Sequence, residues 1–452
     1  MTARDVVAPA AHDHEAAVAF AEQAVDAFAT VGYLPAHGSA VAETDGSTLF
    51  VSGGIQAWRR WIGEPGPAAR AGLQWCVRMN RLADAGRSGF VTSFCMLTAA
   101  RRGAVPRHEV LADLFTALGL IGVDVARTAF VIPALDDRCG DPLASEALAK
   151  LGVDADRIGY APRRWAAPFG ADGPSGPNLF VLLDRTGHGC GPGCAPGCGC
   201  GRYLHFWNCE FLDHRGGTDD GAGRIGAPVV DSAGGLERLW SAVTGEDMFA
   251  GPLLRPVLSA LAAHLPGDPD RAGAVADHAR SLALLLAAGI APAARGQGHV
   301  ARRLARRAGW LLIEAGSDPG ALRPAVLAAQ ACNRAVADFG VASATALGWL
   351  DAEIGHCREG AAHGALLFHR WTHGRSAGAD ITRLVFRLRA ERGVPLSLLR
   401  RWAARDGFTL DEQTLQALLD AERASSRSPA LTAQVAARWA ARTSQSTTPA
   451  RR

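Results

Sequence analysis

Four cysteines crowd into one glycine- and proline-rich stretch of the chain, and thiolates grouped in this way are good ligands for a soft metal ion. They are Cys190, Cys194, Cys198 and Cys200, in the spacing Cys-x3-Cys-x3-Cys-x-Cys. The stretch has no apolar residues to bury, so a tetrahedral zinc ion would fold it. Because the spacing differs from the usual two-plus-two arrangement of zinc knuckles, zinc and free thiols both remain open interpretations.

Short runs of β-type residues alternate with helical segments from about Ala16 to Leu239. The runs are STLFV, GFVTSFCML, TAFVIPAL, NLFVLLD, YLHFWNCEFL and APVVDS. They predict an α+β fold with a mainly antiparallel sheet flanked by helices. Beyond about Thr244, amphipathic segments rich in Ala, Leu and Arg predict an all-helical domain. We therefore expect one domain over 1–245, a helical domain over 246–442 and a frayed tail over 443–452.

The composition is that of an ordinary soluble protein of 452 residues, 48% hydrophobic and 20% charged. The formal net charge of +3 is too small for binding to nucleic acid or membranes through overall charge. Lys150 is the only lysine, so the abundance of arginine reflects composition rather than function. The N-terminus lacks the pattern of a secretory signal, and no run approaches the roughly 18 apolar residues of a membrane span. We expect a cytoplasmic protein.

Three stretches resemble, in order and spacing, the catalytic domain of the alanyl-tRNA synthetases. They are LQWCVRMNR, RRWAAPFGADGPSGP, and the pair YLHFWNCEF and VVDSAGGLERL. The resemblance implies the class II synthetase fold, whose antiparallel sheet carries the site for amino acid and ATP. It also implies the reaction, in which a small amino acid, most simply alanine, reacts with ATP to form an aminoacyl-adenylate and release pyrophosphate.

The resemblance implies which residues bind the amino acid. It puts Trp165 at the amino-acid pocket, and Asn208 and Asp231 around the α-ammonium group. A carboxylate facing an ammonium in a partly dehydrated pocket makes a charge-assisted hydrogen bond that fixes the substrate's orientation. The small residues around Gly234 leave little room beside it. Glu210 stands where the family has a valine that lines the methyl pocket.

For ATP, the resemblance puts Arg78 on the α-phosphate, where a bidentate guanidinium suits the charge that gathers during the reaction. Arg238, at the start of a helix with Glu237, would reach the β- and γ-phosphates, and its flat face would cover adenine. Phe90 would stack on the other side, and Arg81 stands in the preceding loop. Arg78 and Arg238 are the expected catalytic residues, and Mg²⁺ is expected with ATP.

Several positions depart from the family. The returning strand of the second motif has Gly89 at the family's arginine and Cys95 at its glutamate, which weakens or rearranges the ATP contacts. Burying a carboxylate beside a methyl group costs several kcal/mol. Either Glu210 therefore turns outward, or the substrate is not plain alanine.

The helical half is similar to the family's tRNA-recognition domain, notably VADHARSLALLLAAGIAPAARGQGHVARRLARRA. The two polar residues that the family uses to read a G:U pair fall on Gly296 and Ala390, which have no side chain able to bond a base edge. A basic helix face survives for phosphate contacts, formed by Arg302, Arg303, Arg306 and Arg307. The sequence has no residues left for the family's editing and C-terminal domains.

These observations predict a ligase that activates alanine or a similar small amino acid and transfers it to an acceptor. The absence of the two polar residues that read the G:U pair favours a small molecule or another non-standard acceptor, as in synthetase-like enzymes of antibiotic biosynthesis. The complete helical domain favours tRNA charged without editing. A third hypothesis is a catalytically inactive paralogue that binds RNA or an amino acid. The oligomeric state does not follow from the sequence.

Overall fold

A computed structural model describes residues 11–44, 46, 48–65, 68–87, 89–134, 141–162, 165–169, 173–215 and 223–426. The chain divides into two compact units, Met1–Ile354 and Gly355–Arg452. Each unit is described separately below. None of the helices within the described ranges combines the length and hydrophobicity that crossing a bilayer requires.

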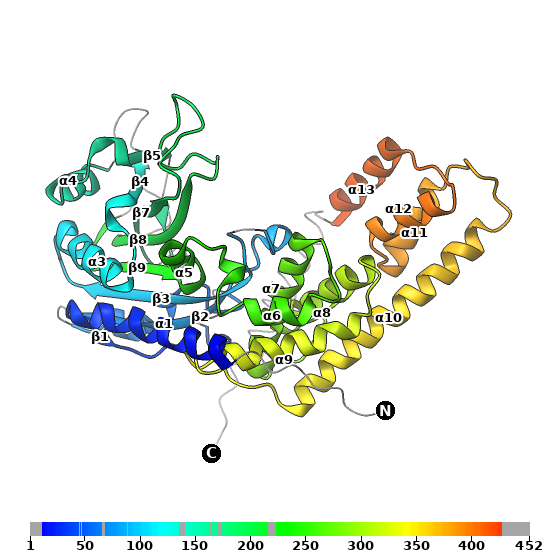
Figure 1. The fold of residues 1–452 in the computed structure, drawn as a ribbon, viewed down its shortest axis with the longest axis horizontal. Helices are drawn as coiled ribbons and strands as arrows, with labels where there is room; N and C mark the ends of the chain where they lie inside the picture. Colours follow the sequence, from blue (N-terminus) through cyan, green and yellow to red (C-terminus); the bar gives the residue numbers. More distant parts are fainter. Residues whose placement is uncertain are drawn as a thin grey trace, which may run out of the picture. The chain divides into compact units, whose positions relative to one another are not determined.

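The first unit is built on a mixed, mainly antiparallel sheet in the order β1-β2-β3-β9-β8-β7-β4-β5, with β6 paired to β7 (Figure 1). The strands are β1 (Leu34–Pro35), β2 (Ala68–Val77), β3 (Ser93–Arg102), β4 (Thr128–Ala134), β5 (Ile158–Pro162), β6 (Trp165–Ala166), β7 (Pro174–Asp184), β8 (Tyr203–Arg215) and β9 (Gly223–Gly235). Pairing is antiparallel from β2 to β4, and parallel only for β1 with β2 and β4 with β5.

Helices cover this sheet and continue into a helical layer. They are α1 (Ala11–Thr30), α2 (Arg59–Ile62), α3 (Arg107–Ile121), α4 (Pro142–Lys150), α5 (Leu236–Thr244), α6 (Arg255–Leu261), α7 (Pro269–Ala287), α8 (Gly296–Glu314), α9 (Leu322–Asn333) and α10 (Ala344–Thr372). A short 3₁₀ helix, η1 (Gly54–Trp58), precedes α2. The α7 helix ends just before Gly289, whose φ of 73° is a left-handed conformation that favours glycine.

The predicted runs GFVTSFCML, TAFVIPAL, NLFVLLD, YLHFWNCEFL and APVVDS all contribute to strands. The run STLFV does not form one, and its described residues lie in a bend. There the Thr48 hydroxyl donates to the carbonyl of Phe50 at 2.8 Å, a local bond that competes with an extended ladder. Val51 still meets the sheet, because its carbonyl accepts from the backbone N–H of Val77 at 2.9 Å.

The α7 helix is buried on all sides, including its polar residues Asp277 and Arg280. Arg280 Nη1 donates to Glu237 Oε1 of α5 at 2.6 Å, and Arg280 also donates to the backbone of Ser93. Asp277 accepts from the backbone N–H of Thr92 at 2.7 Å and from its hydroxyl at 2.6 Å. These bonds fasten α7 to the start of β3 and to α5, so each buried charge has a partner.

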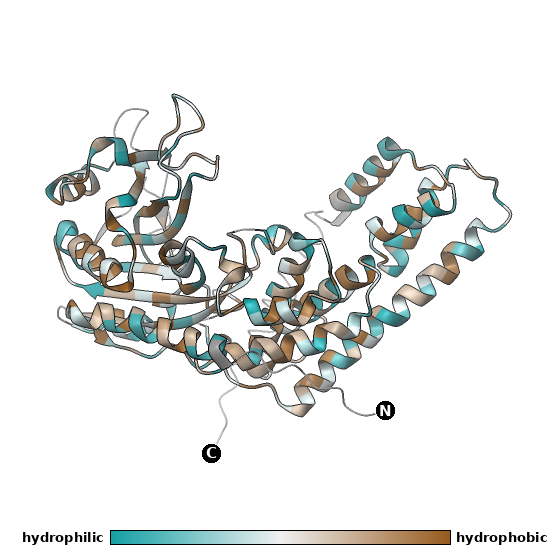
Figure 2. Ribbon diagram, in the orientation of Figure 1, coloured by the Kyte–Doolittle hydropathy of each residue, from teal (hydrophilic) through white to brown (hydrophobic). Residues whose placement is uncertain are grey.

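The second unit contains the end of α10 and three further helices. They are α11 (Thr382–Arg392), α12 (Leu396–Arg405) and α13 (Glu412–Ser426). Hydrophobic and hydrophilic residues alternate along α10 and α13 in Figure 2, as expected of amphipathic helices with one buried face. Within this unit, Phe368 packs against Trp402 and Phe408, with ring centroids 5.6 and 6.4 Å apart.

The predicted α+β architecture, an antiparallel sheet flanked by helices and followed by a helical region, is confirmed. The compact units, however, divide at Ile354, so the predicted boundary near residue 245 falls inside the first of them. The buried bonds from α7 to Thr92 and Glu237 explain this, because they join the first helices beyond residue 245 to the sheet. The predicted tail over 443–452 lies outside the described residues.

We expect the Arg280–Glu237 ion pair to be a main determinant of stability in the first unit. Arg280→Met leaves the buried carboxylate of Glu237 without its cation, which should lower the free energy of unfolding by about 3–5 kcal/mol. Chemical denaturation followed by tryptophan fluorescence measures this.

The double variant Arg280→Met/Glu237→Leu should recover much of the loss, because replacing both charges leaves no unpaired one. Arg303→Ala, which removes an exposed arginine on α8, is the matched control and should change stability by less than about 0.5 kcal/mol. A single variant as stable as the wild type would show that the pair is not a stabilising contact.

Candidate functional site

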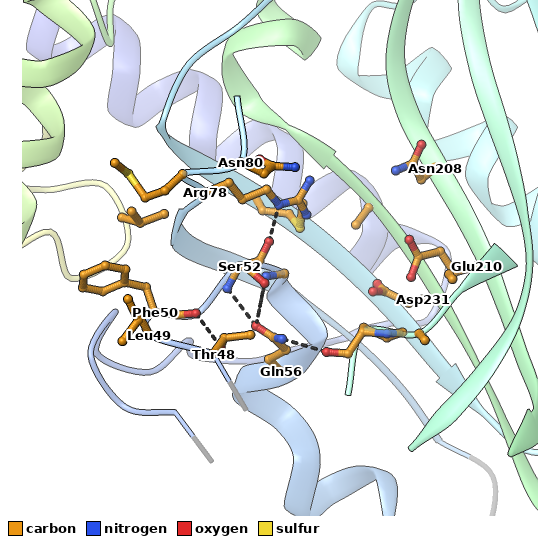
Figure 3. Close-up of a pocket in the computed structure, with 18 of the residues that line it drawn as sticks. Thr48, Leu49, Phe50, Ser52, Gln56, Arg78, Asn80, Asn208, Glu210 and Asp231 are labelled. Carbon is orange, nitrogen blue, oxygen red and sulfur yellow. Dashed lines mark hydrogen bonds between the residues drawn. The ribbon is translucent and has the colours of Figure 1, made fainter. Parts of the chain in front are cut away.

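A cavity of about 810 Å³ lies against the face of the central sheet. Its walls come from β8, β9, the end of β2, the segment from Thr48 to Gln56 and the segment from Ala166 to Pro168. Four residues predicted from the sequence motifs line it together, namely Arg78, Asn208, Glu210 and Asp231 (Figure 3). They come from positions up to 153 residues apart in the chain (231 minus 78) and meet because the sheet aligns their strands.

The strand register decides which side chains face the cavity. Glu210 of β8 stands directly opposite Asp231 of β9, and both side chains line the cavity. Residues at alternate positions, such as Trp207, point into the core below the sheet. Gly234 belongs to this other face, because a Cβ there would lie 2.3 Å from Trp207 Cε3. The structure therefore places Gly234 against the tryptophan and not on the cavity.

A bulge in β8 adjusts the position of Asn208. Leu182 pairs with His205 and Val181 with Trp207, so Phe206 is an extra residue in the ladder. The ring of His205 stacks on Phe180 with centroids 4.3 Å apart, and its Nε2 lies 2.6 Å from Asn208 Oδ1. The histidine thus holds the asparagine amide in place at the edge of the cavity.

Glu210 and Asp231 form a pair of neighbouring carboxylates. Burial raises the pKa of Glu210 to about 7, although the positive charge of Arg78 opposes the shift. Burial, and then the charge of Glu210, raises the pKa of Asp231 well above its ordinary value. In the absence of a bound cation, the pair therefore favours keeping a proton near neutral pH.

The floor of the cavity is rich in hydrogen-bond acceptors that lack donors. Asp231 is only 4% exposed, and its Oδ1 has no hydrogen-bond partner within the part of the chain that the structure describes. Asn178 of β7 stands directly opposite Glu210 and donates from Nδ2 to Glu210 Oε1 at 3.3 Å, while its own Oδ1 has no partner in the described ranges. Buried acceptors without donors are costly. These atoms are therefore suited to a ligand that carries N–H or O–H groups.

Arg78 lies at the other end of the cavity, just beyond β2. Its Nε donates to the carbonyl of Ser52 at 2.6 Å, and its guanidinium lies 4.9 Å from the ring of Phe94. Gln56 holds the supporting loop, since its Oε1 accepts from the backbone N–H of Ser52 at 2.7 Å (Figure 3). The charge of Arg78 also acts on the carboxylate pair, because it opposes the rise in the pKa of Glu210 and of Asp231.

Arg238 joins Arg78 and Arg81 in one region of positive charge. Burial, followed by the charge of Arg78 and then that of Arg81, lowers the pKa of Arg238. Three guanidiniums close enough to repel one another form a natural site for a polyanion. Arg238 itself lies outside the cavity lining, where it donates to the carbonyls of His205, at 3.1 Å, and Gly89.

The remaining predicted ATP residues have protein partners. The guanidinium of Arg81 lies 3.7 Å from the ring centroid of Phe90, and its Nε lies 2.8 Å from Asp84 Oδ2. Arg81 therefore covers the ring that was expected to stack on adenine. Glu237 is 2% exposed and accepts from Arg280 and from the backbone N–H of Cys95, so the structure places it beneath the cavity rather than on its wall.

Trp165 begins β6, where its backbone pairs with Pro177 of β7. Its side chain lies outside the described part of the structure. The residues that follow, from Ala166 to Pro168, line the cavity. The carbonyl of Pro168 accepts from Gln56 Nε2 at 2.7 Å, which joins this wall to η1.

Sequence reasoning missed several polar residues that line the cavity, among them Asn178, Gln56 and Asn80. A signal existed for Asn178, because it is the one polar residue at the start of the otherwise apolar run NLFVLL. Gln56 offered none, since a glutamine in a short helical turn is ordinary on any surface. Asn80 follows Arg78 in the first motif, but nothing in its type or spacing distinguished it.

The cysteine loop lies apart from this cavity, in the connection between β7 and β8. The Sγ atoms of its four cysteines all lie within 4.8 Å of one another. Cys190 and Cys198 are separated by 3.7 Å, and Cys194 and Cys200 by 3.8 Å. Tetrahedral zinc with Zn–S bonds of about 2.3 Å separates its sulfurs by about 3.8 Å. The arrangement therefore fits one zinc ion.

Residues 25–450 match the family described as tRNA synthetases class II (A). The sheet and its cavity are thus a class II ligase domain. Within that class, the chain belongs to the alanyl-tRNA synthetase family.

Individual relatives agree with this family. The alanine–tRNA ligase of Treponema denticola is 27% identical over 304 residues, which cover 63% of this chain and 51% of the relative. That of Mycobacterium ulcerans is 30% identical over 311 residues, covering 63% and 34%. That of Mycobacterium leprae is 28% identical over 441 residues, covering 88% and 47%. The chain spans only about a third to a half of the length of these relatives.

The raised pKa of Glu210 predicts a specific dependence of stability on pH. The pKa of a glutamate in the unfolded chain is about 4.3, whereas burial raises the pKa of Glu210 in the folded chain to about 7. Between these values the unfolded chain binds fewer protons, so stability falls as pH rises. Glu210→Gln removes this loss. The melting temperature of the variant minus that of the wild type should therefore increase from pH 5 to pH 8.

Glu22→Gln is the matched control, because Glu22 is exposed on α1. Its melting temperature should differ from that of the wild type by the same amount at every pH. If the Glu210→Gln difference is also independent of pH, the carboxylate is not titrating in this window.

Proposed function

We propose that the cavity activates alanine or a similar small amino acid with ATP to form an aminoacyl-adenylate. One observation carries the proposal: the carboxylate pair lies at one end of the cavity and Arg78 at the other, and the charges of Arg78 and Arg81 both act on Arg238. An amino acid is a cation at one end and an anion at the other, and ATP is a polyanion. The carboxylates suit the ammonium end of the amino acid, and the arginines suit the phosphates of ATP. The amino acid's own carboxylate would then face the α-phosphate that it attacks.

In the proposed reaction, Asp231 and Asn208 orient the α-ammonium group. The substrate's carboxylate oxygen attacks the α-phosphorus, a new O–P bond forms, and the bond to pyrophosphate breaks with its electron pair. Arg78 stabilises the charge that gathers on the α-phosphate, and Arg238 attracts the leaving phosphates. An acceptor hydroxyl or amine then attacks the activated carbonyl, and AMP leaves.

Mg²⁺ is expected to enter with ATP rather than to be held by the chain. Among the described residues, the carboxylates that line the cavity are Glu210 and Asp231, at the amino-acid end. Glu237 lies outside the lining and pairs through Oε1 with Arg280, and Asp84 pairs with Arg81. Mg²⁺ commonly binds mainly through substrate phosphates and water, which suits a site with few free carboxylates.

For the acceptor, we propose a small molecule or another non-standard partner. Gly296 begins α8 with open space where a side chain would stand, and Ala390 is exposed on α11, so neither residue can bond a base. The basic face expected on α8 is also reduced. Arg302 and Arg306 lie 3.7 and 2.7 Å from the carboxylate of Glu353, which neutralises part of their charge.

Charging of tRNA is the second candidate, and the family match supports it because it extends through the helical region to residue 450. An inactive paralogue that binds RNA or an amino acid is the third, and the protein partners of Phe90 and Glu237 favour it. Two assays separate the three candidate functions. One traps the labelled aminoacyl-adenylate with hydroxylamine, and the other measures transfer of the labelled amino acid to total bacterial tRNA. Trapping without tRNA charging supports our proposal.

Amino-acid-dependent exchange of pyrophosphate into ATP tests activation directly. We expect exchange without any tRNA, and a fall of at least about 100-fold in Arg78→Ala, the size of effect seen when one preorganised donor is lost. Arg127→Ala, which removes an exposed arginine outside the site, is the control and should exchange normally. The absence of exchange with all common and small non-standard amino acids would contradict the proposed function.

We also propose that the cysteine loop holds a structural zinc ion. The loop has little to bury besides Pro196, which packs against Gly159 of β5. Metal bonds would therefore supply most of its folding energy. We place the protein in the cytoplasm, where thiols stay reduced and available for zinc.

Metal analysis of the dialysed protein should find one zinc ion per chain. Cys194→Ser should lower the zinc content and the melting temperature together, because three thiolates bind zinc less tightly than four. Cys357→Ser, at a buried cysteine of α10, should leave the zinc content unchanged. A wild-type protein that is folded and free of zinc would contradict the assignment.

A further inference from the structure

Three acceptor side chains form one row across the cavity floor. Asn178, Glu210 and Asp231 lie on the neighbouring strands β7, β8 and β9, and each stands directly opposite the next. All three line the cavity. Asp231 Oδ1 and Asn178 Oδ1, at the two ends of the row, are buried and have no hydrogen-bond partner among the described residues.

The row is longer than one ammonium group can serve. Neighbouring strands lie about 4.8 Å apart, so the backbones at the ends of the row are separated by about 10 Å. A donor nitrogen bonds acceptors at about 2.9 Å. An α-ammonium bound at Asp231 therefore leaves Asn178 Oδ1 without a donor among the described residues, and leaves Glu210 with the amide of Asn178 at 3.3 Å.

The charges of the row lead to the same conclusion. When both carboxylates are ionised, one α-ammonium group leaves one negative charge uncompensated in a buried site, so the pair keeps a proton unless a second cation binds. Arg78 is the cation whose charge influences both carboxylates. In the proposed reaction, however, Arg78 binds the α-phosphate and so is engaged by an anion of its own. A second positive charge on the substrate would take the place of the proton that the pair otherwise keeps.

We propose that the amino acid activated here is a small diamino acid, an alanine whose β-carbon carries a second amine. Its α-ammonium binds at Asp231 and Asn208, and its side-chain ammonium binds between Glu210 and Asn178. This inference rests on the proposed function, because it assigns the substrate class of the same cavity. It explains how a carboxylate is accommodated at position 210, since the substrate itself neutralises it.

Alanine and serine are the natural competitors. Alanine would place a methyl group against Glu210 and leave its charge and the Asn178 oxygen unpaired. Serine would supply one donor without charge. A site built around buried polar groups rejects a substrate that lacks the matching group, often by factors of about 10⁴. Discrimination among these small amino acids therefore measures the role of the row directly.

The test is pyrophosphate exchange with L-2,3-diaminopropionate, L-serine, L-alanine and glycine. We expect kcat/KM for diaminopropionate to exceed that for alanine by at least about 100-fold. Glu210→Gln should lower the value for diaminopropionate by at least tenfold, and Glu210→Val should shift the preference towards alanine. Glu22→Gln should change neither. A wild-type preference for alanine, glycine or serine would overturn the inference.

Calorimetric binding of diaminopropionate and alanine separates this inference from the proposed function, because binding needs no ATP chemistry. Tighter binding of diaminopropionate that weakens in Glu210→Gln supports the inference, even if exchange is absent and the proposed function fails. Exchange with alanine, together with equal binding of the two amino acids, overturns the inference and leaves the proposed function standing.

Discussion

The buried ion pair between Arg280 and Glu237 is the contact on which the rest of the first unit depends. Arg280 lies on α7, and Glu237 lies in the first turn of α5, directly after the strand that carries Asp231. The same helix holds Thr92 through Asp277. Two charges sealed from water must stay together, because separating them leaves each without solvent or partner. The helical layer and the sheet are therefore fixed to each other from inside.

The contacts between α7 and the sheet also position residues of the site. The carbonyl of Thr92 accepts from the backbone N–H of Arg78 at 2.8 Å, so the residue held by Asp277 also positions the arginine. On the other side of the pair, α5 holds Arg238 near Arg78 and Arg81. Catalytic preorganisation requires charges that do not have to move during the reaction. For the reaction proposed above, the protein core, rather than the cavity surface, would supply that rigidity.

The sequence predicted the sheet and most of the cavity's charged residues. Arg78, Asn208 and Asp231 belong to strand motifs, and the regular register of a sheet converts such motifs into a shared face. The sequence also identified Glu210 as an anomaly, but only the register shows that it faces Asp231. Strand alternation likewise explains why Gly234 faces Trp207, although it lies three residues from Asp231.

Other features depended on contacts between distant segments. The sequence around Glu237 does not indicate that Arg280, 43 residues further along the chain, pairs with it. Nor does the sequence show that Arg81 will cover Phe90, or that polar residues of α7 will be buried against the sheet. The same burial explains why the compact unit extends to Ile354, beyond the boundary suggested by the loss of strand patterns. Local patterns reveal which face of an element is apolar, not which polar residues find partners within the core.

The row of side chains across β7, β8 and β9 has an evolutionary consequence. The side chains proposed to select the amino acid and the arginines proposed to bind phosphate come from different elements of the fold, so the amino-acid pocket can vary while the phosphate-binding arginines stay unchanged. Because Asn178 contacts Glu210 directly, a mutation at position 210 alters the surroundings of position 178. The two positions should therefore co-vary among homologues, and a new substrate range can arise by exchange of one neighbouring pair of residues, without a new fold or a new reaction.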